Sequence, residues 1–271
     1  MKETVGGMSS QARSRSKPGG GKAGGKRGED DLWPENEAAQ PKGKILIGAL
    51  LALLLLVGGV VWFFVQKGGD ELEVPPGSHL PDVYVPQSAS PESTALSQRA
   101  SDIRAFTEGE VFGDFKEVAY RDYTFTLVKS EISTDCVRAA WGDLVLQTLR
   151  RGECSQVARG AYLSKDKKHA GVFTAINMVD AKSAQQVLNS LDPALKGGFI
   201  RPPEFPGVKD FGSGFTAAYS QAIGHYVIMS WVGRAGGEQP RAMNELIDGS
   251  LAVQKPEEFA WGRLVQLEPR R

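Results

Sequence analysis

The sequence has few residues of the kinds that usually form metal or redox sites. It contains two cysteines, Cys136 and Cys154, and three histidines. The cysteines are too far apart for a C-x-x-C motif, and two cysteines alone make a poor metal site. His79, His169 and His225 occur in a proline-rich stretch, a charged loop and a turn. We therefore expect no metal ligand and no cofactor-binding residue among them.

Motifs of common catalytic sites are also missing. There is no G-x-S-x-G motif, and Ser213 in "FGSGF" stands between glycines with no base implied by its context. The stretch "GGKAGGKR" lacks the Ser or Thr of a phosphate-binding loop, and no apolar strand precedes it. Glu108 and Glu110 are spaced like many solvated acids. The sequence predicts no catalytic residue.

The chain has no excess charge of either sign, with 32 basic and 32 acidic residues. Residues 105–271 hold the two kinds in equal number, which predicts no nucleic-acid partner. Residues 4–28 are basic and rich in Gly and Ser, and the acidic "EDDLWPENE" follows. Such a segment buries too little apolar surface to fold, so residues 1–43 are expected to form a disordered tail. A docking motif centred on Trp33 is the alternative interpretation of the tail.

One long apolar run dominates the rest of the sequence. From Ile45 to Val65 there are 21 residues without a charged side chain. A helix that crosses a hydrocarbon core of about 30 Å needs roughly 20 such residues. The run is longer than the apolar core of a signal peptide, and no A-x-A cleavage pattern follows it. Residues 44–66 are therefore predicted to form a transmembrane helix.

Basic residues flank this run unequally. Lys26, Arg27, Lys42 and Lys44 precede it, whereas Lys67 follows it together with several acids. The positive-inside rule places the N-terminus in the cytoplasm. We expect a single-pass protein of the plasma membrane, with the lipid bilayer as a partner and the C-terminal part outside the cell.

Residues 67–104 are rich in proline and poor in apolar residues. This composition is typical of a semi-extended stalk. The short stretch "VYV" at residues 83–85 is given no structure.

Residues 105–271 are long enough for one domain with its own core. Their apolar residues alternate between strand and helix periods. Strands are expected at 121–132, 154–164, 170–179, 215–223 and 225–233, and helices between Val137 and Leu149, after the N-cap Asp180, and at 240–253. Residues 192–213 are expected to form a long loop. The order predicts an α+β domain of two α-β-β halves, with a mostly antiparallel sheet and helices on one face.

Both cysteines fall in the predicted outer domain, where a disulfide is the usual state. A straight helix from Cys136 to Arg150 would span about 21 Å. Four extended residues recover roughly 14 Å, so a gap of about 7 Å would remain, at the limit for a bridge. Gly142 can break the helix and Asp143 can cap a second one. We predict a Cys136–Cys154 disulfide; free thiols and a redox or metal role are the alternatives.

The pattern "DC", an amphipathic stretch, "GECSQVARGAYLS" and a hairpin resembles single-pass membrane proteins of actinobacterial type. These have a disordered cytoplasmic start and an extracytoplasmic domain of unknown function. The resemblance covers about residues 40–240. It implies the location and a disulfide, and it carries no catalytic residue.

The function expected from the sequence is a non-catalytic domain that binds or senses an envelope protein or a glycan. A cell-envelope hydrolase is the alternative. A deep pocket that joins a histidine or a pair of carboxylates would favour the enzyme, whereas a flat or apolar surface would favour binding. The loop "RPPEFPG", with Arg201 and Phe205, is either a binding loop or a rigid connection.

Overall fold

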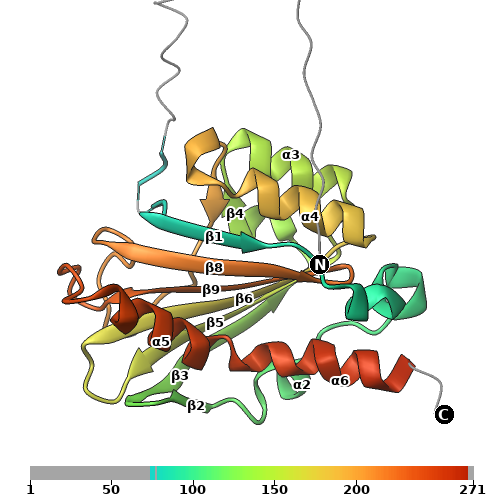
Figure 1. The fold of residues 1–271 in the computed structure, drawn as a ribbon. Coiled ribbons are helices and arrows are strands. Elements are labelled where there is room, and N and C mark those ends of the chain that lie inside the picture. Colours follow the sequence, from blue (N-terminus) through green and yellow to red (C-terminus); the bar gives the residue numbers. More distant parts are fainter. Residues whose placement is uncertain (1–73, 77, 268–271) are drawn as a thin grey trace, which may run out of the picture. The chain divides into compact units, whose positions relative to one another are not determined.

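The computed structural model describes residues 74–76 and 78–267, which contain a curled, mixed sheet of seven strands with helices packed on it (Figure 1). The predicted α+β class and the mostly antiparallel sheet are confirmed. No helix in the described part of the chain is long and apolar enough to cross a membrane. The predicted tail at 1–43 and the predicted span from Ile45 to Val65 lie outside the described residues.

The strands of the main sheet, in spatial order, are β1 (Val83–Gln87), β8 (Thr216–Ile223), β9 (Tyr226–Arg234), β6 (His169–Asn177), β5 (Gln156–Ser164), β3 (Tyr123–Ser133) and β2 (Glu117–Tyr120). A second sheet pairs β4 (Ala140–Trp141) with β7 (Phe199–Ile200). The α-helices are α2 (Glu108–Phe112), α3 (Asp143–Arg151), α4 (Ala181–Ser190), α5 (Met243–Val253) and α6 (Glu258–Leu267). Short 3-10 helices are η1 (Pro91–Leu96), η2 (Arg99–Ser101), η3 (Cys136–Ala139), η4 (Pro193–Leu195) and η5 (Lys255–Glu257).

The middle of the sheet is made of two hairpins. The β5–β6 and β8–β9 hairpins join along an antiparallel β6–β9 pair. Each hairpin follows a helix, α3 or α4, and these two helices lie side by side (Figure 1). Asp180 caps α4 as expected, since its Oδ1 accepts a hydrogen bond of 2.7 Å from the Ser183 amide. Gly224, with a φ of 58°, forms the tight β8–β9 turn.

Helices cover both faces of the sheet, so the prediction of helices on one face is wrong. The core around α3 and α4 includes Val172 and Met229, whereas the core around α5 and α6 includes Phe173 and Ile228. Neighbouring residues of β6 and β9 thus enter opposite cores, as the alternation of a strand requires. Both strands are apolar and buried at almost every position. Such strands need cover on both sides.

The prediction of a stalk at 67–104 is wrong for residues 78–104. Strand β1 pairs in parallel with β8 and forms one edge of the sheet. Tyr84 of β1 donates a hydrogen bond of 2.8 Å to the Leu188 carbonyl, and Leu96 is fully buried. An edge strand tolerates a proline such as Pro86, so proline content alone did not exclude this strand. The folded domain therefore begins well before residue 105.

The segment after α5 forms η5 and α6 around a buried arginine. Arg263 is 1% exposed. Its guanidinium donates to Glu110 Oε1 at 2.8 Å and to the Tyr226 hydroxyl at 2.7 Å. It also donates to the carbonyls of Arg104 at 2.9 Å and Ala105 at 3.0 Å. A buried charge is tolerated only when it is paired in this way, so Arg263 fixes α6 to α2 and β9.

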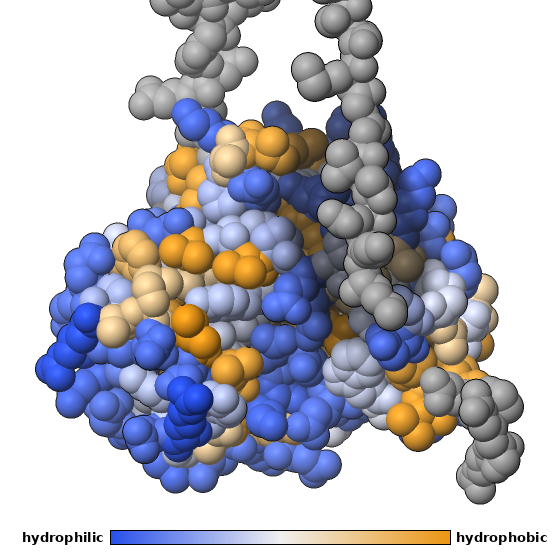
Figure 2. Space-filling model, viewed as in Figure 1, coloured by the Kyte–Doolittle hydropathy of each residue, from blue (hydrophilic) through white to orange (hydrophobic). Residues whose placement is uncertain are grey.

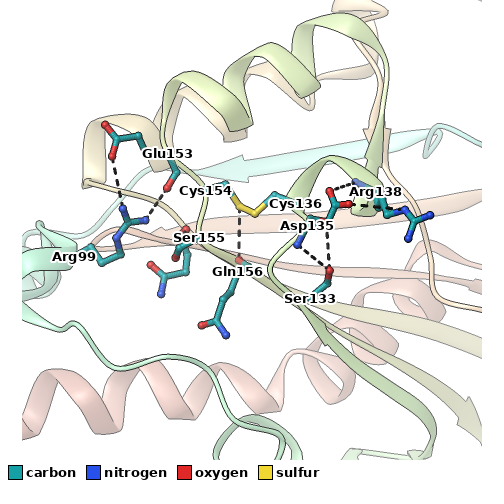
Figure 3. The surroundings of a disulfide bond; sticks show 10 residues. Arg99, Ser133, Asp135, Cys136, Arg138, Glu153, Cys154, Ser155 and Gln156 are labelled. Atoms are coloured by element: carbon teal, nitrogen blue, oxygen red, sulfur yellow. Dashed lines mark hydrogen bonds and ion pairs between the residues drawn. A yellow bond between two sulfur atoms is a disulfide. The ribbon is translucent and has the colours of Figure 1, made fainter.

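The disulfide between Cys136 and Cys154 is present, with a Cα–Cα distance of 6.2 Å (Figure 3). The predicted break at Gly142 is confirmed, with a φ of 85°. A Cβ there would lie 2.3 Å from the Gly198 backbone, so no larger residue fits. The segment before the break is η3 and β4 rather than an α-helix. Asp143 is the first residue of α3, and its predicted role as the cap is wrong.

Replacing both cysteines, Cys136→Ser with Cys154→Ser, should lower the free energy of unfolding by about 3 kcal/mol. The reason is that the unfolded chain gains the freedom of the opened loop. Urea unfolding followed by tryptophan fluorescence measures this loss. As a control, a reductant should destabilise the natural protein by the same amount and leave the double variant unchanged. An equal unfolding midpoint for both proteins without reductant would contradict the prediction.

Candidate functional site

The candidate site is a hollow at the end of the sheet where the β5–β6 turn meets the start of α5, on the left in Figure 1. We call it the polar hollow; its volume is about 480 Å³. It is lined by Asp122, Tyr123, Thr124, Ser164, Lys165, Asp166, Lys168, His169, Arg234, Arg241 and Glu245. A second hollow of about 460 Å³, the cationic hollow, adjoins it and shares Lys168, Arg234 and Arg241.

The β5–β6 turn is held in place by Ser164. Its hydroxyl donates to Asp166 Oδ1 at 2.6 Å and accepts from the amides of Lys168 at 3.1 Å and His169 at 2.9 Å. Lys167 takes the left-handed conformation, with a φ of 59°, that closes the turn. These local bonds place His169 at the first position of β6.

The strand register brings His169 beside Arg234, because these two residues are partners in the β6–β9 pair. Glu245 of α5 lies against both. Its Oε2 is 3.3 Å from His169 Nε2 and 3.8 Å from Arg234 Nε, and its Oε1 accepts from the Arg241 amide at 3.2 Å. The Tyr123 ring packs edge-to-face on His169, with 5.2 Å between centroids. The side chains of His169 and Glu245 are each 12% exposed, so their relative positions are well fixed.

Tyr123 and Arg234 are two of the groups in the polar hollow that can donate hydrogen bonds. Burial raises the pKa of the Tyr123 hydroxyl, and the carboxylates of Glu245, Asp248 and Asp122 raise it further. Tyr123 therefore stays a neutral donor at physiological pH. Arg234 Nε is buried and has no hydrogen-bond partner among the described residues. Buried donors are rarely left unpaired; this one lies 3.8 Å from Glu245 Oε2, within ion-pair range, and Arg234 lines the hollow.

The polar hollow contains serine, histidine and glutamate, the residue types of a hydrolytic triad, but it does not assemble one. The Ser164 hydroxyl is used inside the turn, and His169 Nε2 faces Glu245. Within residues 74–76 and 78–267, no hydrogen bond joins Ser164 Oγ to the imidazole. A nucleophile needs a base within hydrogen-bond reach. The geometry thus suits recognition of a polar ligand better than nucleophilic attack.

The other candidates from the sequence lie away from this hollow. His79 Nε2 is 2.8 Å from Asp210 Oδ1, near the surface. Arg201 donates to the Ala140 carbonyl at 2.9 Å and to Ser78 Oγ at 3.0 Å, and Phe205 packs on Phe211. These contacts favour the rigid-connection interpretation of "RPPEFPG". In the described residues, no group of three or more His, Cys, Asp or Glu is arranged to hold a metal ion.

Arg234 and Glu245 were not singled out in the sequence. The signal for Arg234 was a charged residue directly after the apolar run "YVIMSWVG". Glu245 gave no such signal, because acids are common in the first turn of a helix.

Comparison of the chain with protein-family models, curated proteins and solved structures gives no match. Inference about function therefore starts from the geometry of the two hollows.

His225 lies at the β8–β9 turn, as expected, and is buried there. It is 0% exposed, and its Nδ1 donates to the Leu96 carbonyl at 2.6 Å. Its Nε2 has no hydrogen-bond partner among the described residues. Burial lowers the pKa of the imidazole, because the charged form would lose its hydration, although the bond to Leu96 acts in the opposite direction.

This lowered pKa predicts acid sensitivity. The unfolded chain binds a proton near pH 6.5, whereas the folded protein binds it only at lower pH. The contribution to stability is complete above about pH 6.5 and is lost as the pH falls from there toward the folded-state pKa. His225→Asn keeps a donor near Leu96 and removes the titration. Urea unfolding at about pH 7 and about pH 5 should show a smaller loss in the variant than in the natural protein.

His225→Gln is the check, since it removes the same titration with a different side chain. Its loss of stability between about pH 7 and about pH 5 should also be smaller than that of the natural protein. An unchanged pH dependence in His225→Asn would show that His225 does not carry this acid sensitivity.

Proposed function

We propose that this chain is a single-pass membrane protein that presents a non-catalytic binding domain outside the cell. The apolar run from Ile45 to Val65 and its basic N-terminal flank support the anchor and its orientation. The Cys136–Cys154 disulfide supports an oxidising surrounding for the domain. The ligand that we propose is an envelope glycan held in the polar hollow.

One observation carries this proposal: Arg234 and Glu245 both line the polar hollow and form an ion pair there, with 3.8 Å between Nε and Oε2. Ligand sites combine a concave surface with a few convergent polar groups. A guanidinium and a carboxylate side by side can donate to and accept from neighbouring hydroxyls of a sugar. The rings of Tyr123 and His169 add a less polar wall.

A cell-envelope hydrolase is the second candidate. The His169–Glu245 pair inside the polar hollow favours it, because a histidine oriented by a carboxylate can act as a general base. Against it stands the Ser164 hydroxyl, which is bonded within its own turn. Activity would then require a water molecule as the nucleophile.

Thiol labelling of intact cells tests the location. A membrane-impermeant maleimide should label the chain only after mild reduction, because the two cysteines lie outside and are bonded to each other. The half-buried Cys154 gives the reagent access once the bond is open. Labelling that needs cell lysis, with or without reductant, would put the domain in the cytoplasm and contradict the proposal.

We also predict that the domain binds a glycan without cleaving it. The full chain in neutral lipid nanodiscs should bind a soluble amino-sugar oligosaccharide in isothermal titration, and chromatography should show no product. Arg234→Gln should weaken binding about tenfold, since a charge-assisted hydrogen bond is lost. Arg138→Gln, a change of the same type at a side chain that is 85% exposed, serves as the control.

Two results would contradict this prediction. Product that forms with the natural chain and disappears in His169→Gln would establish the hydrolase instead. Equal binding by Arg234→Gln and Arg138→Gln would move the glycan site away from the polar hollow.

A further inference from the structure

We infer that the cationic hollow binds the phosphate or carboxylate groups of an anionic ligand, so that the glycan proposed for the polar hollow belongs to an anionic polymer. This inference rests on the proposed function, because the two hollows share Lys168, Arg234 and Arg241. The two hollows therefore meet at these three side chains.

The charges around the cationic hollow are unbalanced. It is lined by four cationic side chains, Lys167, Lys168, Arg234 and Arg241, and by one acid, Glu238. Lys168 and Arg234 lie 3.8 Å from carboxylates, those of Asp166 and Glu245, on the side of the polar hollow. Within the part of the chain that the structure describes, Lys167 and Arg241 form no ion pair.

The four cations come from three segments that the backbone holds together. Lys167 and Lys168 belong to the β5–β6 turn, Arg234 ends β9, and Arg241 precedes α5. The Ala235 amide donates to the Lys168 carbonyl at 2.9 Å, which fastens the loop after β9 to the turn. Gly237, with a φ of 78°, lets this loop fold back, and its amide donates to the Arg234 carbonyl at 3.0 Å. The convergence of the cations is thus built into the fold.

Within the described residues, Lys167 and Arg241 contribute no ion pair to the stability of the fold. Lys167, Lys168 and Arg241 are exposed. Like charges that converge on one hollow repel each other and lower the stability of the folded state. By contrast, the neighbouring Lys165 lies 2.9 Å from Glu117 and is neutralised there. An anion in the hollow would remove the repulsion, and Arg241 could bind a phosphate or carboxylate through two parallel hydrogen bonds.

Figure 2 agrees with a solvent-facing polar site at this position. The end of the molecule that carries the β5–β6 hairpin is predominantly hydrophilic, with strongly hydrophilic side chains at its outer edge (Figure 2). The apolar side chains Met243, Ile247 and Leu251 of α5 are each about 40% exposed; Met243 begins the helix beside the site, and Ile247 and Leu251 lie further along it.

The test uses the full chain in nanodiscs of phosphatidylcholine and inorganic pyrophosphate as the probe. Isothermal titration should show binding that weakens as the salt concentration rises, as expected for exposed charges. The double variant Lys167→Gln with Arg241→Gln should bind pyrophosphate about tenfold more weakly, since two charge-assisted contacts are lost. The matched control, Lys116→Gln with Arg138→Gln, removes the same charges from exposed positions that line neither hollow and should bind like the natural chain.

A stability measurement separates a binding role from a structural one. The Tm of the Lys167→Gln, Arg241→Gln variant should equal or exceed that of the natural chain, because repulsion is removed. A lower Tm would assign these cations to the fold and overturn the inference. So would pyrophosphate binding that is absent, or binding that is equal in the double variant and the control.

Two further arms identify the source of the anion and separate this inference from the proposed function. The first arm uses vesicles of phosphatidylglycerol and phosphatidylcholine in equal parts. If the natural chain binds them and the double variant does not, a lipid headgroup is the source of the anion. Binding of soluble glycerol phosphate without vesicle binding supports the anionic polymer, whereas vesicle binding overturns the polymer as the source of the anion. Oligosaccharide binding without pyrophosphate binding would overturn the inference and leave the proposed function standing, whereas loss of both would overturn both.

Discussion

The antiparallel pairing of β6 with β9 is the interaction on which the rest of the structure depends. Both strands are buried on both faces, so each face needs its own cover of helices. The α3–α4 layer supplies one, and α5 with α6 supplies the other. The same pairing creates the candidate site, because its register ends on the His169–Arg234 pair. At that point the apolar strands reach solvent, and polar side chains replace apolar ones.

Two buried polar networks fasten the outer parts of the chain to this central pair. Arg263 joins α6 to Tyr226 at the start of β9, and His225 joins the β8–β9 turn to η1 through the Leu96 carbonyl. The disulfide does the same for the segment between β3 and β5. In each case the bond adds to apolar packing by the same segment, as of Phe259 in α6, Leu96 in η1 and Trp141 between β3 and β5.

The sequence predicted the parts of the fold that depend on local patterns. The α3 to β9 order, the Asp180 cap, the Gly224 turn and the break at Gly142 all follow from periodicity or from one conformational requirement. Apart from the cap role given to Asp143 and the helix expected from Val137, the failures concern partners distant in sequence. Strand β1 is defined by pairing with β8, and α6 by the burial of Arg263, which has no local signature. For the site, His169 was noticed only as a loop residue, since the register that pairs it with Arg234 cannot be derived from either strand alone.

The two hollows differ in how their charged side chains are paired. In the polar hollow Glu245 lies between His169 and Arg234, so charge is balanced and the side chains are held in position. In the cationic hollow the same Arg234 faces Lys167 and Arg241, for which the described part of the chain offers no acid partner. A protein that only needed to keep this end of the sheet soluble would mix charges evenly over it. The unpaired cations beside the Glu245 group instead fit the ligand that we propose, which has an uncharged part and an anionic part.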